Sequence, residues 1–281
     1  IDYRVMQWQL WSATLPQFHY DPAALEQMVP TVDGICATYL MRVLVMFGDI
    51  NVLLTGQSGT AKTSIMREFR RSDDTEALSF AYVPFSARST SEDFQPVVEG
   101  QLDERSKDLL GPPSDTKMII LVDDLSLPQP DAFATQQTTE CVRQLIDSRG
   151  FYDAKGLFWK QVVDTQIVAA RTPHGGGHSQ ICGRLLRHFH MIGLMEPDDA
   201  DLLTIFGSLL SGWVENGADV TASSVLLWLP AYIEKAAAGS IALFSAVRDK
   251  LLPTPAKCHY VFNLRDILRV FEGLRCYQMK H

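Results

Sequence analysis

The chain has 281 residues, of which 46% are hydrophobic and 21% are charged. This composition is that of a globular protein, which excludes a disordered or collagen-like chain, and the length corresponds to about two domains. The formal net charge of −8 argues against nucleic acid or an anionic membrane as a partner, because surfaces that bind them need clustered lysine and arginine.

Cysteine usage and apolar run lengths indicate a soluble protein of a reducing compartment. The five cysteines are scattered and none forms a C-x-x-C pair, which favours buried thiols over disulfides or a zinc site. The longest apolar stretch, 35–47, is interrupted by Arg42 and is too short to span a bilayer. No signal segment or initiator methionine opens the chain. We therefore expect a cytosolic piece of a longer polypeptide.

Strands and helices are predicted to alternate through the first two thirds of the chain. Residues 1–30 mix aromatic residues with prolines, which favours an irregular segment that packs over the large domain. The apolar runs predict strands at 51–55, 79–85, 117–122, 166–170 and 191–194, and the stretches between them predict helices at 62–71, 91–108, 133–148 and 184–188. An insert with Tyr152, Phe158 and Trp159 is predicted as a loop. This alternation indicates a mostly parallel sheet flanked by helices.

Beyond residue 196 the pattern is only helical. Apolar residues recur at helical spacing across 202–213, and an Asn-Gly pair should stop that helix. A second helix is predicted across 223–238, bent at Pro230, and a third begins at Asn263, which can cap it together with Asp266. The predicted architecture is an N-terminal segment (1–30), a large α/β domain (31–196) and a small all-helical domain (197–281).

A phosphate-binding loop is predicted directly after the first strand. Residues 56–63 read GQSGTAKT, which matches G-x-x-x-x-G-K-[ST] except that Ala61 stands in place of the second glycine. Backbone N–H groups and the helix N-terminus should bind an anion, Lys62 should reach the β- and γ-phosphates, and Thr63 should ligate Mg²⁺. We expect Ala61 to exclude a positive φ at modest cost. The residues expected to bind nucleotide are Gly56, Gln57, Ser58, Gly59, Thr60, Ala61, Lys62 and Thr63. The alternative is an ordinary surface loop.

Two adjacent carboxylates close the buried strand at 117–122. Asp123 and Asp124 should lie at the carboxyl edge of the sheet, where open α/β sheets bind ligands. Asp123 is expected to hold Mg²⁺, mainly through water. Asp124 stands where a Glu usually polarises the attacking water, and a misplacement of about 1 Å can cost roughly 10²-fold in rate. Nucleotide binding is therefore better supported than fast hydrolysis, and a surface turn is the alternative.

Two other candidate sites are weaker. His174 and His178 flank three glycines near Cys182, but such a turn gives no rigid ligand face for a metal. Cys258 next to His259 is a sequence neighbour and not a positioned nucleophile–base pair.

Taken together, these motifs resemble an AAA+ ATPase module, and more narrowly the third AAA+ module of axonemal (ciliary) dynein heavy chains. The resembling stretches keep the family's order and cover nearly the whole chain. They are MVPTVD (28–33), NVLLTGQSGTAKT (51–63), VPFSARSTSEDFQ (83–95), ILVDDLSLPQPDAF (120–133), ECVRQLIDSRGFYD (140–153), HGGGHSQICGRLLRHF (174–189) and LLPTPAKCHYVFNLRDILRVFEG (251–273).

The resemblance implies further roles for single residues. Thr172 falls near sensor I, and Arg265 matches sensor II, the lid arginine that contacts the γ-phosphate. Arg184 and Arg187 match the region that offers an arginine finger to the adjacent module. The strand bordering the adenine pocket is matched by Val29, Pro30 and Thr31. The chain departs from the family at His178, Cys182 and Thr139.

The resemblance also implies cofactors, partners and a role. The cofactors are ATP or ADP with Mg²⁺, and the role is regulation of microtubule-based motility through nucleotide state. The partners are neighbouring AAA+ modules of the same heavy chain, dynein complex subunits, and microtubules through the rest of that chain. The implied location is the cytoplasm, in the cytoskeleton and the axoneme of a cilium or flagellum. Whether this site hydrolyses ATP stays open. The alternatives are a non-hydrolysing spacer of the ring and a stand-alone AAA+ remodelling ATPase that forms a homo-hexamer.

Overall fold

The computed structural model of the chain describes residues 8–21, 27–72, 77–113, 116–153, 156–175, 178–217, 229–257 and 259–276. The chain divides into two compact units. The α/β unit consists of residues 37–57 and the described residues of 61–194. The helical unit consists of the described residues up to 36, residues 58–60 and the described residues from 195 onward. The sequence placed the boundary at residue 196, and the change of unit falls after Leu194.

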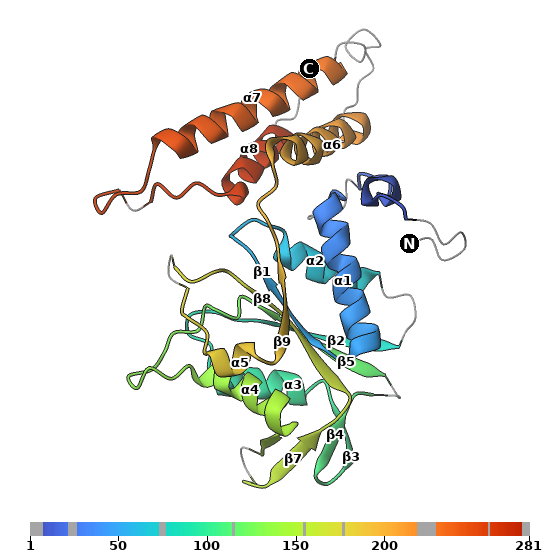
Figure 1. Ribbon diagram of the computed structural model, residues 1–281, viewed down its shortest axis with the longest axis vertical. Coiled ribbons are helices and arrows are strands. Elements are labelled where there is room, and N and C mark those ends of the chain that lie inside the picture. The colour runs from blue at the N-terminus through green and yellow to red at the C-terminus, as the bar shows by residue number, and fades with distance from the viewer. Residues whose placement is uncertain are drawn as a thin grey trace. The chain divides into compact units, whose positions relative to one another are not determined.

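A five-stranded parallel sheet forms the core of the α/β unit (Figure 1). Its order is β2-β5-β8-β1-β9, and every neighbouring pair is parallel. The central strands are near-continuous apolar runs because both of their faces are covered. The strand bounds are β1 (Asn51–Thr55), β2 (Leu78–Pro84), β5 (Lys117–Asp123), β8 (Thr165–Arg171) and β9 (Phe189–Gly193).

Helices pack on both faces of this sheet (Figure 1). On one face lie α1 (Val32–Gly48) and α2 (Lys62–Arg71), and Phe69 of α2 packs edge-to-face on Phe80 of β2. On the other lie α3 (Ser91–Glu99), α4 (Gln137–Ser148) and α5 (Gly183–Leu186), which share one apolar cluster with the sheet. The predicted fold class, a parallel sheet flanked by helices, is confirmed.

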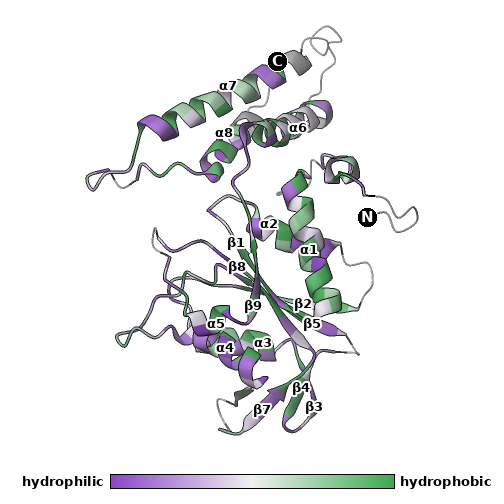
Figure 2. Ribbon diagram, in the orientation of Figure 1, coloured by the Kyte–Doolittle hydropathy of each residue, from purple (hydrophilic) through white to green (hydrophobic). Residues whose placement is uncertain are grey.

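Helix α1 was not among the predicted elements. The helix is hydrophobic along most of its length (Figure 2), and it buries one stripe formed by Ala37, Met41 and Val45. Phe47 on the opposite side is 86% exposed. None of the helices in the described part of the chain is long and apolar enough to cross a membrane.

A second, four-stranded sheet corrects two predictions. Its order is β3-β4-β7-β6, and it consists of β3 (Asp103–Ser106), β4 (Leu109–Gly111), β6 (Gly150–Tyr152) and β7 (Trp159–Val162). The helix predicted over 91–108 is wrong beyond Glu99, because Leu102 and Leu110 turn into the core and β3 pairs with β4. The insert predicted as a loop is an antiparallel pair, β6 with β7. The β4–β7 pairing joins distant segments, whereas β3–β4 and β6–β7 pair neighbouring segments whose strands, of three or four residues, are too short for an alternating pattern.

Three helices form the core of the helical unit: α6 (Asp199–Gly217), α7 (Leu229–Lys250) and α8 (Leu264–Cys276). Phe206 stacks on Phe271 with 4.2 Å between ring centroids. The prediction that the second helix ends at residue 238 is wrong, because α7 continues to Lys250. Residues 218–228, where that prediction began, lie outside the described residues. Pro230 lies in the first turn of α7, where its missing N–H costs no helical bond.

The described part of the N-terminal segment groups with the helical unit, whereas the sequence analysis expected it on the large domain. It includes a single 3₁₀ turn, η1 (Trp11–Thr14). The side chain of Tyr20 occupies the space that a Cβ at Gly212 of α6 would fill. A glycine at this place in α6 therefore admits an aromatic residue from the N-terminal segment.

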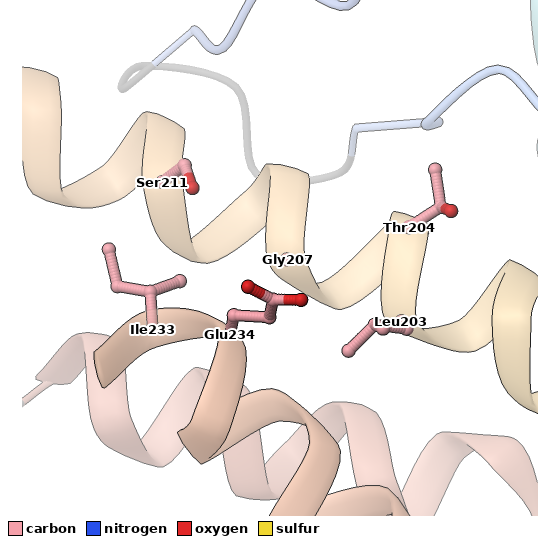
Figure 3. A pocket seen from close by; sticks show the side chains of 6 residues that line it. All are labelled: Leu203, Thr204, Gly207, Ser211, Ile233 and Glu234. Carbon is pink, nitrogen blue, oxygen red and sulfur yellow. The ribbon is translucent and has the colours of Figure 1, made fainter. Parts of the chain in front are cut away.

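A hollow of about 280 Å³ lies between α6 and α7 (Figure 3). It is lined by Leu203, Thr204, Gly207, Ser211, Ile233 and Glu234. Glu234 is the one ionisable side chain among these lining residues, and it is acidic. None of the described residues that line the hollow has a positively charged side chain that could bind a phosphate group.

Candidate functional site

The phosphate loop has the strand–loop–helix geometry that its sequence predicts. The loop begins after β1 ends at Thr55, and α2 begins at Lys62. Gly59 takes φ of 94°, a value that glycine adopts without strain. The expectation that Ala61 excludes a positive φ is wrong, because Ala61 takes φ of 60° and ψ of 18° as the N-cap of α2. The loop therefore has the left-handed backbone that the motif's glycine would adopt, and the methyl group of Ala61 makes this conformation strained.

Lys62 is held inside the loop. The residue is only 7% exposed, and Nζ donates to the carbonyl oxygens of Gly56 at 2.8 Å and Gln57 at 2.7 Å. A buried ammonium is costly unless it is paired, so these carbonyls keep the charge in place. Incoming phosphate oxygens would provide a stronger, charge-assisted pairing for the same group.

Thr63 and Asp123 meet although sixty residues separate them. Thr63 Oγ1 donates to Asp123 Oδ2 at 2.8 Å, and the backbone N–H of Asp124 donates to Asp123 Oδ1 at 3.1 Å. Asp123 is 7% exposed. The parallel pairing of β5 and β1 with β8 brings the ends of these strands to one edge of the sheet. A hydroxyl and a carboxylate are the hard oxygen ligands that suit Mg²⁺, so the residues present fit this ion.

Tyr82 is a site residue that the sequence analysis missed. Its hydroxyl donates to Asp123 Oδ2 at 3.0 Å. Burial and the Asp123 charge raise the pKa of Tyr82, so its proton stays bound at neutral pH. The stretch around it indicated only a strand. Strand alternation places Phe80 and Tyr82 on one face, but it does not show that this face meets α2 and Asp123.

Asp124 and Thr172 lie at the same edge of the sheet. Asp124 is partly exposed and takes φ of 54° immediately after β5. Thr172 is 9% exposed and follows β8, the strand between β5 and β1. The N–H of Gly56 donates to Arg171 O at 3.3 Å, which ties the start of the phosphate loop to the end of β8.

Comparison with known proteins identifies the family. The family described as "P-loop containing dynein motor region" matches residues 17–197, and the one described as "AAA+ lid domain" matches residues 236–279. The chain belongs to the dynein motor-region family. It is therefore a dynein heavy chain AAA+ module of P-loop ATPase type, and the resemblance to dynein heavy chains is confirmed.

The chain is similar in sequence to dynein heavy chains, of which it matches only a small part. It is 34% identical over 280 residues to dynein axonemal heavy chain 6 of Homo sapiens, covering 98% of this chain and 6% of that protein. It is 34% identical over 275 residues to dynein axonemal heavy chain 5 of Rattus norvegicus, covering 95% of this chain and 8% of that protein. It is 33% identical over 270 residues to the dynein-1-alpha heavy chain, flagellar inner arm I1 complex, of Chlamydomonas reinhardtii. This match covers 95% of this chain and 6% of that protein. The chain thus spans under a tenth of each relative's length.

A solved structure of NtrX from Brucella abortus in complex with ADP has a TM-score of 0.45 and 14% sequence identity to this chain. The match covers 88% of this chain and 62% of that one, and the family assignment does not rest on it.

The two arginines of the dynein module's α5 region differ in their surroundings. Arg187 is 3.2 Å from Asp147 Oδ1, and its Nε donates to His188. Asp147 also accepts from Arg143 at 2.6 Å and lies 2.9 Å from His188 Nε2. Arg184 is exposed and forms no ion pair with a described residue. Arg187 is thus part of a structural network, and Arg184 is the more available cation.

The remaining predicted site residues belong to the helical unit. Val29 is 7% exposed, and Thr31 Oγ1 accepts the N–H of Gly34 at 3.2 Å as a cap of α1. Arg265 is exposed in the first turn of α8. The residue before it, Leu264, approaches the loop backbone, because a Cβ at Gly59 would lie 2.7 Å from Leu264 Cβ.

The weaker candidates gain no support as sites. His178 Nδ1 lies 3.1 Å from Ser126 Oγ, and His178 pairs with Gly175 across the turn. No group of three or more His, Cys, Asp or Glu able to hold a metal occurs within the described residues. Cys258 lies outside the described residues.

Proposed function

We propose that this chain binds Mg·ATP or Mg·ADP through residues 56–63, Asp123 and Asp124. The hydrogen bond from Thr63 to Asp123, at 2.8 Å, carries the proposal, because it joins the phosphate loop to the carboxylate that would hold the metal. The loop N–H groups and the α2 N-terminus would bind the phosphates, with Lys62 on the β- and γ-oxygens. Bound Mg²⁺ would neutralise charge on those oxygens.

The proposal also assigns roles in hydrolysis and in adenine binding. Asp124 would polarise the attacking water, with Thr172 beside it at the sheet edge. Arg265 of the helical unit would contact the γ-phosphate, and Val29–Thr31 would border the adenine. Arg184, which is the more available cation, is the better candidate for a finger to a neighbouring module. Such a finger is worth about 10³ to 10⁵ in rate in related phosphoryl transfers.

At the level of the whole protein, we propose the third AAA+ module of an axonemal dynein heavy chain, acting in the axoneme of a cilium or flagellum. The names of the relatives and the motif order support this placement. Its partners would be the neighbouring modules, dynein complex subunits and, through the rest of the heavy chain, microtubules. Nucleotide state would regulate motility only if ATP and ADP make different contacts here.

A second candidate role is a spacer module that holds nucleotide without hydrolysing it. The short, left-handed Asp124 favours it, since this residue offers less reach than a Glu. The two roles are distinguished by loading the heavy chain with one round of labelled ATP and recovering the nucleotide after a single turnover. Under the hydrolytic role, Asp124→Asn raises the share recovered as ATP. An unchanged share would favour the spacer.

A further inference from the structure

We propose that Tyr82 is a positioning residue for Mg²⁺, whose hydroxyl holds the Asp123 carboxylate in the orientation that receives the metal. The inference rests on the proposed function, because it needs Mg·nucleotide at the phosphate loop. Its starting observation is that one oxygen, Asp123 Oδ2, accepts two hydroxyl groups: Thr63 at 2.8 Å and Tyr82 at 3.0 Å.

The fold places the phenol beside the metal-binding residues. Strand β2 pairs with β5 so that Tyr82 lies opposite Leu121. Phe80 and Tyr82 share the face of β2 that meets α2, and Phe80 packs on Phe69 at 5.7 Å between ring centroids. This aromatic pair fixes α2 against β2. Tyr82 is therefore held next to the first turns of α2, where the metal would bind.

The acceptor sites of Asp123 explain what the phenol does. An ionised carboxylate offers about four lone-pair sites, two on each oxygen. Thr63 and Tyr82 fill the two sites of Oδ2, and the N–H of Asp124 fills one site of Oδ1. Among the described residues, these three are the donors to the carboxylate, and the backbone carbonyl of Asp123 separately accepts the N–H of Phe85 at 2.9 Å. The carboxylate therefore cannot rotate without losing a bond, and the remaining site of Oδ1 would accept a water molecule of bound Mg²⁺.

The chemistry of the carboxylate sets the direction of the phenol's hydrogen bond. An ionised carboxylate can only accept, so Tyr82 donates its proton to Asp123 Oδ2. Burial and the Asp123 charge raise the pKa of Tyr82, and Arg67, one turn after Thr63 on α2, acts in the opposite direction. Residues of α2, β2 and β5 thus meet at one carboxylate oxygen.

The test compares ADP affinity in Mg²⁺ with ADP affinity in EDTA for the chain and for Tyr82→Phe. The ratio of the two affinities measures the contribution of the metal. Loss of an outer-shell partner typically costs about 10- to 100-fold in metal affinity, so we expect Tyr82→Phe to lower this ratio by about tenfold or more. The affinity in EDTA should not change. Tyr152→Phe, which removes a hydroxyl from a residue 59% exposed in β6, should leave both affinities as they are.

A purely structural role for Tyr82 gives a different result. It would weaken ADP binding equally in Mg²⁺ and in EDTA, or leave both affinities unchanged. In either case the ratio stays that of the parent, which overturns the inference while the nucleotide site stands. If the parent chain, shown to be folded, binds ADP in neither solution, the proposed function fails and the positioning role fails with it.

Discussion

Ala61 keeps a backbone conformation that favours glycine. A left-handed conformation costs an ordinary residue about 1–2 kcal/mol, because Cβ approaches the following carbonyl. The phosphate loop nevertheless keeps φ of 60° at this position. The geometry of the anion nest is therefore imposed by the surrounding loop, and the sequence departure at Ala61 does not change its shape.

Ala61→Gly should consequently stabilise the chain. The removed strain exceeds the entropy that glycine loses on folding, so we expect a gain of about 0.5–1 kcal/mol in the free energy of unfolding. Denaturant titration measures it. Ala87→Gly serves as the control, because Ala87 lies in a turn and does not take a positive φ. This variant should be less stable than the parent chain. Equal losses in the two variants would show that Ala61 is not strained.

The elements that the sequence predicted well are those with local signals. Strand β1 and helix α2 have the bounds predicted from sequence, because an apolar run and a glycine turn define them within a few residues. The strands of the second sheet could not be predicted in this way. Strand β4 pairs with β7, and Leu110 lies opposite Val162 although about fifty residues separate them. Pairing of that kind leaves no periodic pattern in either segment.

The start of α8 is a local signal that the structure confirms. Asn263 Oδ1 accepts the N–H of Arg265 at 2.9 Å, and Asp266 Oδ2 accepts the N–H of Asn263 at 2.9 Å. These reciprocal bonds satisfy donors that a helix start otherwise leaves without partners. They also fix the first turn, in which Arg265 lies.

We expect Asn263→Ala to weaken this helix start. Loss of such a cap costs about 1 kcal/mol, equivalent to a roughly fivefold larger population of the opened first turn. Amide hydrogen exchange at the first turn of α8 measures the change, and Asn263→Ser, which keeps a capping oxygen, should restore much of the protection. Equal exchange rates in the parent and the alanine variant would mean that the cap contributes nothing.

At the scale of the molecule, the sequence predicts those residues of the candidate site that lie in one contiguous motif or at the end of a predicted strand. The phosphate loop is contiguous, and Asp123 closes a strand whose parallel partners bring it to the same edge. Tyr82 could not be predicted, because its role depends on which face of β2 meets α2. The engagement of Arg187 by Asp147 likewise depends on contacts between α4 and the chain after α5.

The central claim is that the phosphate loop binds nucleotide. The most direct measurement is thermal unfolding of the chain with and without Mg·ADP, beside Lys62→Ala, which removes the ammonium held at Gly56 and Gln57. Ligand at 100-fold over its Kd should stabilise the parent by about 2.7 kcal/mol, and the shift should vanish in Lys62→Ala. A folded parent that shows no shift, or an equal shift in both proteins, would contradict the claim.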